Sequence, residues 1–228
     1  MRLAPMPGPI TTWKDPAMKP ATLVAIVAAG GLVALSAGIW VATQWGRGDD
    51  PFADCREGVV AGGAGAIGGP FELVLPSGET VTDAEVITEP TLLYFGYTFC
   101  PDICPLDNVR NADAVDLLAE AGYSVTPVMI SVDPARDTPE VMGQYAANIH
   151  DKMIGLTGSE AQVAQAAKAY RAYYKKNDDD PEFYSVDHSA FTYLVLPGIG
   201  FAEFFRRDVS PVQLAERATC FIERMGPA

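Results

Sequence analysis

The sequence predicts an α/β fold in which helices cover both faces of a central sheet. Two continuous apolar runs are typical of strands buried on both sides, at residues 91–97 and 126–132. Segments with helical periodicity alternate with them, at 106–121, 139–149 and 159–176. A strand pair at 189–196 and 201–207 and a last helix at 211–224 complete the series. This order of elements is that of a thioredoxin-like core.

A long apolar segment precedes this domain. Residues 21–45 carry no charged side chain over 25 positions, whereas about 20 apolar residues suffice for a helix to cross a bilayer. Three basic residues (Arg2, Lys14 and Lys19) precede the segment and only Arg47 follows it closely, so the positive-inside rule predicts a cytoplasmic N-terminus. We therefore expect an uncleaved single-pass anchor in the cell inner membrane, with the functional domain in the periplasm.

The pattern divides the chain into four regions: a cytoplasmic segment (1–20), a transmembrane anchor (21–45), a flexible tether (46–69) and the thioredoxin-like domain (70–228). The tether is assigned from its glycine content, since six glycines lie between Gly58 and Gly69. An extra N-terminal β-hairpin is expected before the core, because Pro76-Ser77-Gly78 separates two strand-like runs at 71–75 and 80–87.

Composition excludes some classes of function. The 228 residues contain 16 Lys and Arg against 29 Asp and Glu, a formal net charge of −13. We expect no nucleic-acid partner, since phosphate binding needs a basic surface. The acidic run Asp178-Asp179-Asp180 with Glu182 is either a solvated loop or a docking surface for a basic partner.

A cysteine pair follows the first buried strand. Cys100 and Cys104 lie at a strand-to-helix turn, where open α/β folds commonly host their chemistry. Pro105 suits the first turn of a helix, so we expect the regular helix to begin near it with Cys104 as the cap. Three residues separate the thiols instead of the two of a usual redox pair. This spacing leaves room for a metal ion and still permits a redox-active disulfide.

Two thiolates select a soft metal such as Cu(I) or zinc, but they do not fill a coordination shell. The chain has only two histidines. His150 ends a predicted helix, where a structural role at the helix C-terminus is favoured. His188 lies just before an apolar strand and is the candidate third ligand, although the residues alone leave a structural role open.

Five stretches together resemble the Sco/SenC family of copper-handling proteins. They occur in the family's order and extend over roughly 70 to 225: YFGYTFCPDICP (94–105), ISVDPARDTPE (130–140), GLTG (155–158), YRAYY (170–174) and VDHS (186–189). The resemblance implies a membrane-anchored thioredoxin-like domain that binds one copper ion. Two thiolates and an imidazole suit Cu(I), and the same turn can hold Cu(II) when oxygen or nitrogen donors are added. By the same resemblance the ligands are Cys100, Cys104 and His188.

The family helps to assemble the binuclear copper (CuA) centre on subunit II of cytochrome c oxidase. The resemblance therefore implies subunit II and a periplasmic copper donor as partners, and a metallochaperone as the function. The alternative is a thiol–disulfide oxidoreductase that reduces the CuA-ligand cysteines of subunit II, which needs the Cys100 and Cys104 pair but not His188. Whether the protein is an enzyme is thus left open. A peroxidase is disfavoured, because the Pro-x-x-x-Thr-x-x-Cys arrangement is absent around Cys100.

Several residues near these motifs have more than one interpretation. Asp187 is a candidate to orient the neighbouring His188 ring. Asp133, Arg136 and Asp137 either tie down the loop after the second core strand or line the site. The tyrosines of the YRAYY stretch (Tyr170, Tyr173 and Tyr174) are expected in a helix core.

The remaining cysteines lie outside the copper-binding turn. In an exported protein Cys55 and Cys220 are expected to form a disulfide that pins the tether to the last helix. Free thiols and an intermolecular link are the alternatives.

Overall fold

The computed structural model describes residues 20–45, 50–56, 63–177 and 183–226. The chain separates into two units, Met1–Asp50 and Pro51–Ala228. The expected cytoplasmic segment and the acidic run at 178–182 lie outside the described residues, apart from Pro20. The folded unit begins at Pro51 and not at residue 70, because Phe52, Cys55 and Ile67 of the expected tether pack on the domain.

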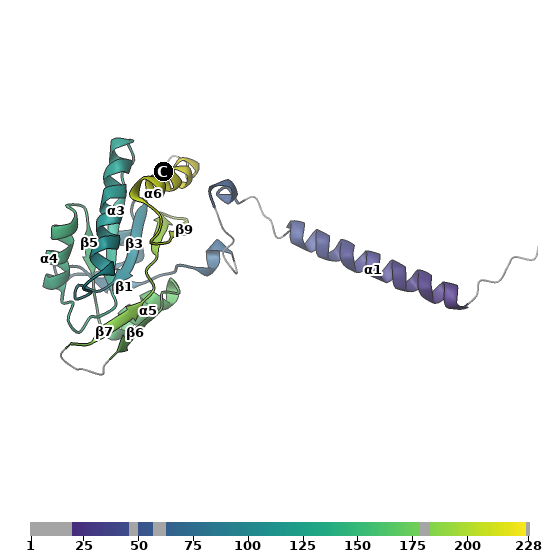
Figure 1. The fold of residues 1–228 in the computed structure, drawn as a ribbon, viewed down its shortest axis with the longest axis horizontal. Coiled ribbons are helices and arrows are strands. Elements are labelled where there is room, and N and C mark those ends of the chain that lie inside the picture. The colour runs from purple at the N-terminus through teal and green to yellow at the C-terminus, as the bar shows by residue number, and fades with distance from the viewer. Residues whose placement is uncertain (1–19, 46–49, 57–62, 178–182, 227–228) are drawn as a thin grey trace, which may run out of the picture. The chain divides into compact units, whose positions relative to one another are not determined.

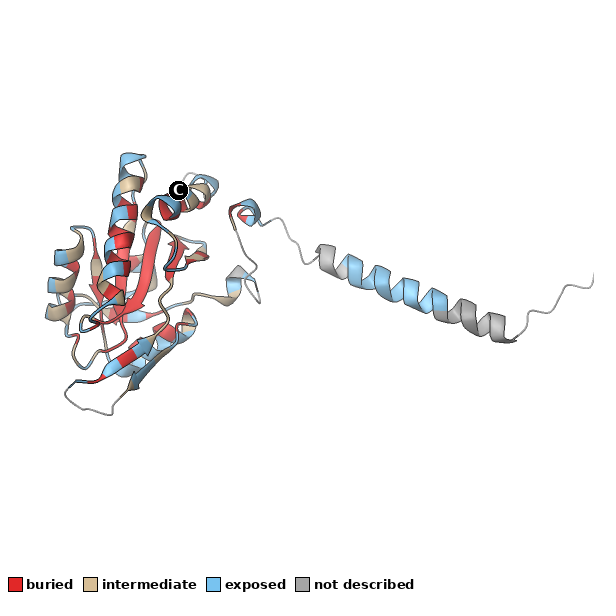
Figure 2. Ribbon diagram, in the orientation of Figure 1, coloured by how far each residue is buried: buried red, intermediate tan, exposed pale blue. Residues whose placement is uncertain are grey.

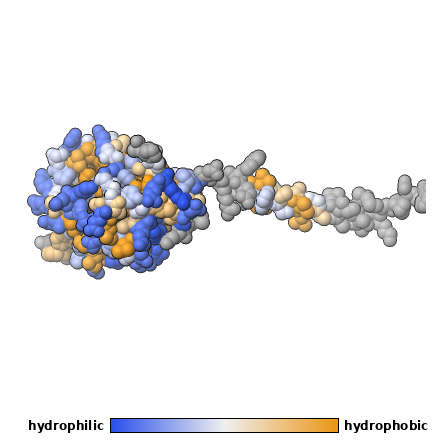
Figure 3. All heavy atoms as spheres, turned by 90° about the horizontal axis from the view of Figure 1, so that it is seen from above, coloured by the Kyte–Doolittle hydropathy of each residue, from blue (hydrophilic) through white to orange (hydrophobic). Residues whose placement is uncertain are grey.

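The described part of the first unit forms a long helix, α1 (Pro20–Trp45), of 26 residues. Its described side chains, at 29–41, are apolar or weakly polar (Figure 3). Among the residues that the structure describes, no helix is both long enough and apolar enough to span a membrane. The membrane anchor therefore stays a prediction.

A five-stranded mixed sheet forms the centre of the second unit (Figure 1). Its strands in spatial order are β5 (Ile154–Leu156), β4 (Thr126–Ser131), β3 (Thr91–Gly96), β8 (Thr192–Leu196) and β9 (Gly200–Phe205). The first three are parallel to one another, whereas β8 is antiparallel to β3 and to β9. Every residue of β3 is buried, as the continuous apolar run predicts for a central strand.

Four helices surround this sheet: α3 (Ile103–Glu120), α4 (Pro139–Ile149), α5 (Glu160–Ala169) and α6 (Pro211–Arg224). Because side chains alternate along a strand, Leu92 and Leu194 pack with α3 and α6 on one face. Leu93 and Phe95 pack with α5 and the N-terminal hairpin on the other face. Figure 2 shows the buried residues on the sheet and on the sides of the helices that meet it. The expected α/β fold is confirmed, and α4 and α6 have the predicted bounds.

The expected N-terminal hairpin is present but short. It consists of β1 (Glu72–Val74) and β2 (Thr80–Thr82), which pair antiparallel. The second run does not continue as a strand to residue 87, because a four-residue helix, α2 (Asp83–Val86), begins there. Thr82 and Glu85 form a capping box that satisfies the free backbone N–H groups at the start of this helix.

The predicted helix at 159–176 is wrong in its second half. The helix α5 ends at Ala169, and Arg171 adopts a left-handed φ of 52° that a helix cannot contain. The chain then forms β6 (Tyr174–Asn177), which pairs with β7 (Ser185–His188). Of the three tyrosines, Tyr170 is buried but Tyr173 is 58% exposed, so they are not one helix core.

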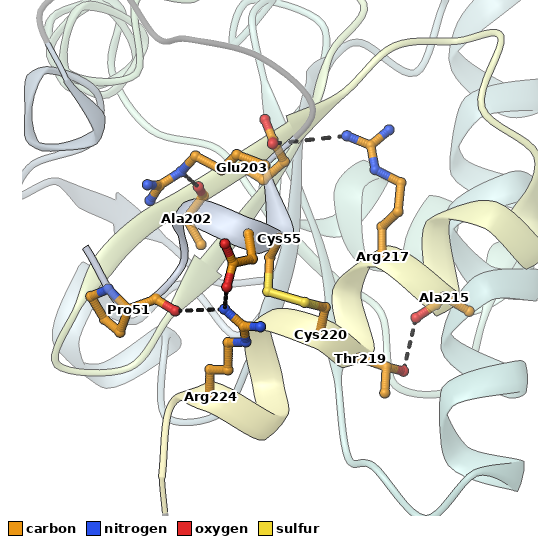
Figure 4. Close-up of a disulfide and its surroundings, with 11 residues drawn as sticks. Pro51, Cys55, Ala202, Glu203, Ala215, Arg217, Thr219, Cys220 and Arg224 are labelled. Carbon is orange, nitrogen blue, oxygen red and sulfur yellow. Dashed lines mark hydrogen bonds and ion pairs between the residues drawn. A yellow bond between two sulfur atoms is a disulfide. The ribbon is translucent and has the colours of Figure 1, made fainter. Parts of the chain in front are cut away.

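The disulfide expected between Cys55 and Cys220 is present and joins a short 3-10 turn, η1 (Ala53–Cys55), to α6 (Figure 4). Phe52 packs on Phe221 beside it, with ring centroids 5.6 Å apart. The Arg224 guanidinium donates to the Pro51 carbonyl and to the Asp54 carboxylate, each at 3.1 Å. Residues 51–56 are thus a fixed part of the domain. A second 3-10 turn, η2 (Ala64–Ala66), follows.

Removing this disulfide should destabilise the domain, because the bond links residues 165 positions apart and so restricts the unfolded chain. The double variant Cys55→Ser/Cys220→Ser should lose about 3 kcal/mol of unfolding free energy, measured by urea titration. Arg224→Gln is the matched control, since it removes the exposed ion pair and keeps the disulfide; its midpoint should stay close to that of the parent protein. Equal midpoints for the double variant and the parent would contradict this assignment.

Candidate metal centre

The turn that carries the two cysteines leaves the C-terminal end of β3. The helix α3 begins at Ile103 with Asp102 as its N-cap, so Cys104 lies in the first helical turn and is not the expected cap. Pro105 is tolerated there because backbone N–H groups in a first turn have no helical partner. The Cys104 N–H is directed at the Cys100 sulfur, at 3.4 Å. Both cysteines are free thiols and both are buried.

The loop after β4 supports this turn from the neighbouring strand. Strands β3 and β4 are parallel and in register to their ends, so their following loops meet at one edge of the sheet. The buried Asp137 carboxylate accepts hydrogen bonds from the backbone N–H and the hydroxyl of Thr98 and from the Ser131 hydroxyl. Burial raises the pKa of Asp137, although these hydrogen bonds oppose the shift. Asp137 therefore ties down the loop and the cysteine turn together.

His188 reaches the cysteines from the end of β7, not from a loop. Its Nε2 atom lies 3.2 Å from the Cys104 sulfur. Its Nδ1 atom lies 3.1 Å from the Ser189 carbonyl oxygen, which can only accept, so Nδ1 carries the proton and Nε2 keeps a free lone pair. Asp187 is exposed and on the opposite side of the strand, because successive side chains alternate. The backbone of Ser189, and not Asp187, contacts the ring.

The donor atoms of Cys100, Cys104 and His188 all lie within 4.8 Å of one another. Two sulfurs and one imidazole nitrogen suit a soft ion such as Cu(I), and they fit poorly to the hard ions Ca²⁺ and Mg²⁺. His150 lies elsewhere, at the C-cap of α4, where its Nε2 contacts Asp116 at 3.2 Å. The structural interpretation of His150 is thus the one its surroundings support.

Burial controls the protonation of the donors. It raises the pKa of the Cys104 thiol, and it lowers the pKa of His188. At neutral pH in the metal-free protein the Cys104 thiol is therefore protonated and the imidazole is neutral. Binding of a cation must release the thiol proton, so affinity falls as the pH falls.

The packing around Cys104 restricts the residue at position 96. A Cβ atom at Gly96 would lie 3.0 Å from the Cys104 sulfur and 2.7 Å from the Tyr94 ring. Only glycine therefore lets β3 pass beneath the sulfur. The rings of Tyr94 and Tyr97 each meet the His188 ring edge to face, at centroid distances of 6.0 and 5.8 Å. These two aromatic contacts fix the orientation of the imidazole ring.

A buried charged group next to the site was not anticipated from the sequence. The Asp107 carboxylate accepts a hydrogen bond from the Tyr94 hydroxyl at 3.1 Å and pairs with Arg207 at 3.3 Å. Arg110 lies 3.7 Å away on the same helix. The available signal was the spacing, since Asp107 follows Cys104 by three residues and must share its helix face.

Comparisons with known proteins agree with this geometry. The family model described as SCO1/SenC matches residues 60–223. Protein SenC of Rhodobacter capsulatus is 50% identical over 208 residues, which cover 91% of this chain and 92% of that protein.

Two solved structures show the same fold. The crystal structure of Arabidopsis thaliana ScoI with copper bound is 41% identical, covers 70% of this chain and 99% of that chain, and superposes with a TM-score of 0.65. BsSco, described as a member of the Sco family of cytochrome c oxidase assembly proteins, is 26% identical, covers 68% and 95% of the two chains, and gives a TM-score of 0.55. The report on BsSco identifies a disulfide switch.

Proposed function

Since this chain belongs to the SCO1/SenC family, we propose that it is a copper metallochaperone for the assembly of cytochrome c oxidase. One copper ion is held by Cys100, Cys104 and His188 and is delivered to the CuA centre of subunit II. The observation that carries the proposal is the convergence of the three donor atoms within 4.8 Å. The copper bound to Arabidopsis thaliana ScoI supports the choice of metal.

The residues suggest how copper is received and released. Copper enters only when Cys100 and Cys104 are free thiols and not joined in a disulfide. Each sulfur loses its proton as it binds the ion. His188 presents the Nε2 lone pair without reorganisation, because the Ser189 carbonyl already orients the ring. A thiolate of the acceptor then replaces one donor at a time, and the remaining donors keep the ion bound between exchanges. A periplasmic donor supplies the copper.

The second candidate function is a thiol–disulfide oxidoreductase that reduces the CuA-ligand cysteines of subunit II. The observation that favours it is the pair of free thiols at the start of α3. This function needs the two cysteines but has no use for an imidazole 3.2 Å from one of them. His188 therefore separates the two functions.

Replacing His188 with alanine should lower Cu(I) retention against a competing chelator about tenfold or more, because one of three donors is lost. The redox midpoint of the Cys100 and Cys104 pair should change little, and oxidase assembly in cells should fail. His150→Ala is the matched control, since it removes the chain's other histidine, which contacts Asp116 and not the cysteines.

The outcomes of this comparison are distinct. Lost copper retention with lost oxidase assembly supports copper delivery. Normal assembly by His188→Ala, despite poor copper retention, would instead establish the oxidoreductase as the function that cells require.

We further propose that α1 anchors the protein in the inner membrane, with the N-terminus in the cytoplasm and the second unit in the periplasm. The uncharged stretch at 21–45 and the 26-residue length of the helix support the anchor. The Cys55–Cys220 disulfide supports an oxidising compartment.

Extraction of cell membranes with alkaline carbonate tests the anchor. The full-length chain should stay in the membrane pellet, because a spanning helix is not released by loss of ionic contacts. Replacing two central residues of the segment, Leu32 and Leu35, with Asp should release it into the soluble fraction. Release of the parent chain under the same conditions would contradict the anchor.

A further inference from the structure

The hairpin that carries His188 is not part of the central sheet. Strands β6 and β7 form a separate two-stranded sheet, whereas Cys100 lies on the turn after β3 and Cys104 in the first turn of α3. Within the described residues, the backbone ladder therefore does not fix His188 relative to the two sulfurs. Beyond the short link of residues 189–191 to β8, side-chain contacts between the hairpin and the domain hold it there.

One arginine contacts the hairpin where β7 begins. Arg136 lies on the loop after β4, and its Nη1 donates a hydrogen bond to the Tyr184 carbonyl at 3.0 Å. Its guanidinium also lies 3.6 Å from the centroid of the Tyr184 ring. Asp133 completes the group, since its carboxylate accepts from the Arg136 Nε and, at 2.7 Å, from the Tyr184 hydroxyl. Tyr184 is buried and precedes His188 by four residues.

The same guanidinium contacts the cysteine turn. Its central carbon lies 4.7 Å from the centroid of the Phe99 ring and 5.7 Å from that of Tyr97. Phe99 precedes Cys100, and the Tyr97 ring meets the His188 ring edge to face. Arg136 thus touches both segments that supply metal ligands. A flat, delocalised guanidinium can stack on several rings while its N–H groups donate in plane, which an ammonium cannot do.

We propose that Asp133, Arg136 and Tyr184 form a clamp that holds the β6–β7 hairpin on the cysteine turn and so positions His188 at the sulfurs. Arg136 is a positioning residue and does not bind the metal. The inference rests on the proposed function in one respect, namely that His188 is a copper ligand.

A double-mutant cycle with His188 tests the clamp. We would measure Cu(I) retention against a competing chelator for the full-length reduced protein. Arg136→Gln should weaken retention about tenfold when His188 is present. It should change retention less than about twofold in the His188→Ala background, because a residue that acts through His188 has nothing left to position. Equal losses in both backgrounds, or no loss in either, would overturn the clamp.

Two further variants exclude a general loss of folding. Arg136→Lys keeps the charge but loses the planar stack. On a logarithmic scale, its copper affinity should therefore recover less than half of the difference between Arg136→Gln and the parent protein. Arg56→Gln is the matched control, since Arg56 also donates to a backbone carbonyl, that of Ala202, and lies over a ring, that of Phe52, but on another part of the domain. It should leave retention unchanged, and a loss equal to that of Arg136→Gln would overturn the clamp.

Hydrogen exchange of the copper-free protein provides a readout that does not depend on copper binding. Arg136→Gln should accelerate exchange of the backbone amides in β6 and β7 at least tenfold and leave β3 and β4 unchanged, because only the hairpin is released. Unchanged exchange in β6 and β7 would overturn the clamp. If the parent protein failed to retain copper while this exchange result held, the proposed function would fall and the clamp would remain.

Discussion

The 3.2 Å approach of the His188 Nε2 atom to the Cys104 sulfur is the contact on which the site depends. It joins residues 84 positions apart, one in the first turn of α3 and one at the end of a separate hairpin. Burial keeps the Cys104 thiol and the imidazole uncharged without metal, so no ionic attraction between them holds the contact. A hydrogen bond from the neutral thiol to Nε2 and the surrounding packing hold it instead. This explains why the glycine at position 96 and the two tyrosine rings lie directly against these two side chains.

Two carboxylates near the site are paired with arginines, although the chain as a whole is strongly acidic. Asp107 on the cysteine helix is paired with Arg110 and Arg207, and Asp133 on the loop after β4 is paired with Arg136. Hard cations therefore meet no concentrated negative charge in these two pairs, and the softness of sulfur and imidazole decides which ion binds. Two of the arginines also join distant segments, because Arg207 pairs with the cysteine helix and Arg136 lies against the rings of Phe99 and Tyr184.

Local patterns predicted much of the fold and of the site. The continuous apolar runs identified β3 and β4, the bounds of α4 and α6 were correct, and the cysteine spacing with the resemblance identified the three converging donors. The hairpin that carries His188 was missed, because the helical periodicity of 160–169 continues into the tyrosines. No local sequence signal indicates that Arg171 adopts a left-handed backbone conformation. The roles of Arg136 and Asp107 were also beyond the sequence, since each depends on partners brought together only by the folded sheet.

X-ray absorption at the copper edge of the loaded, full-length protein tests the central claim most directly. Two sulfur scatterers and one imidazole should surround each copper ion, and the imidazole should disappear in His188→Ala while both sulfurs remain. A copper ion surrounded by sulfur alone in the parent protein, with the same spectrum in that variant, would show that His188 is not a ligand and would contradict the account.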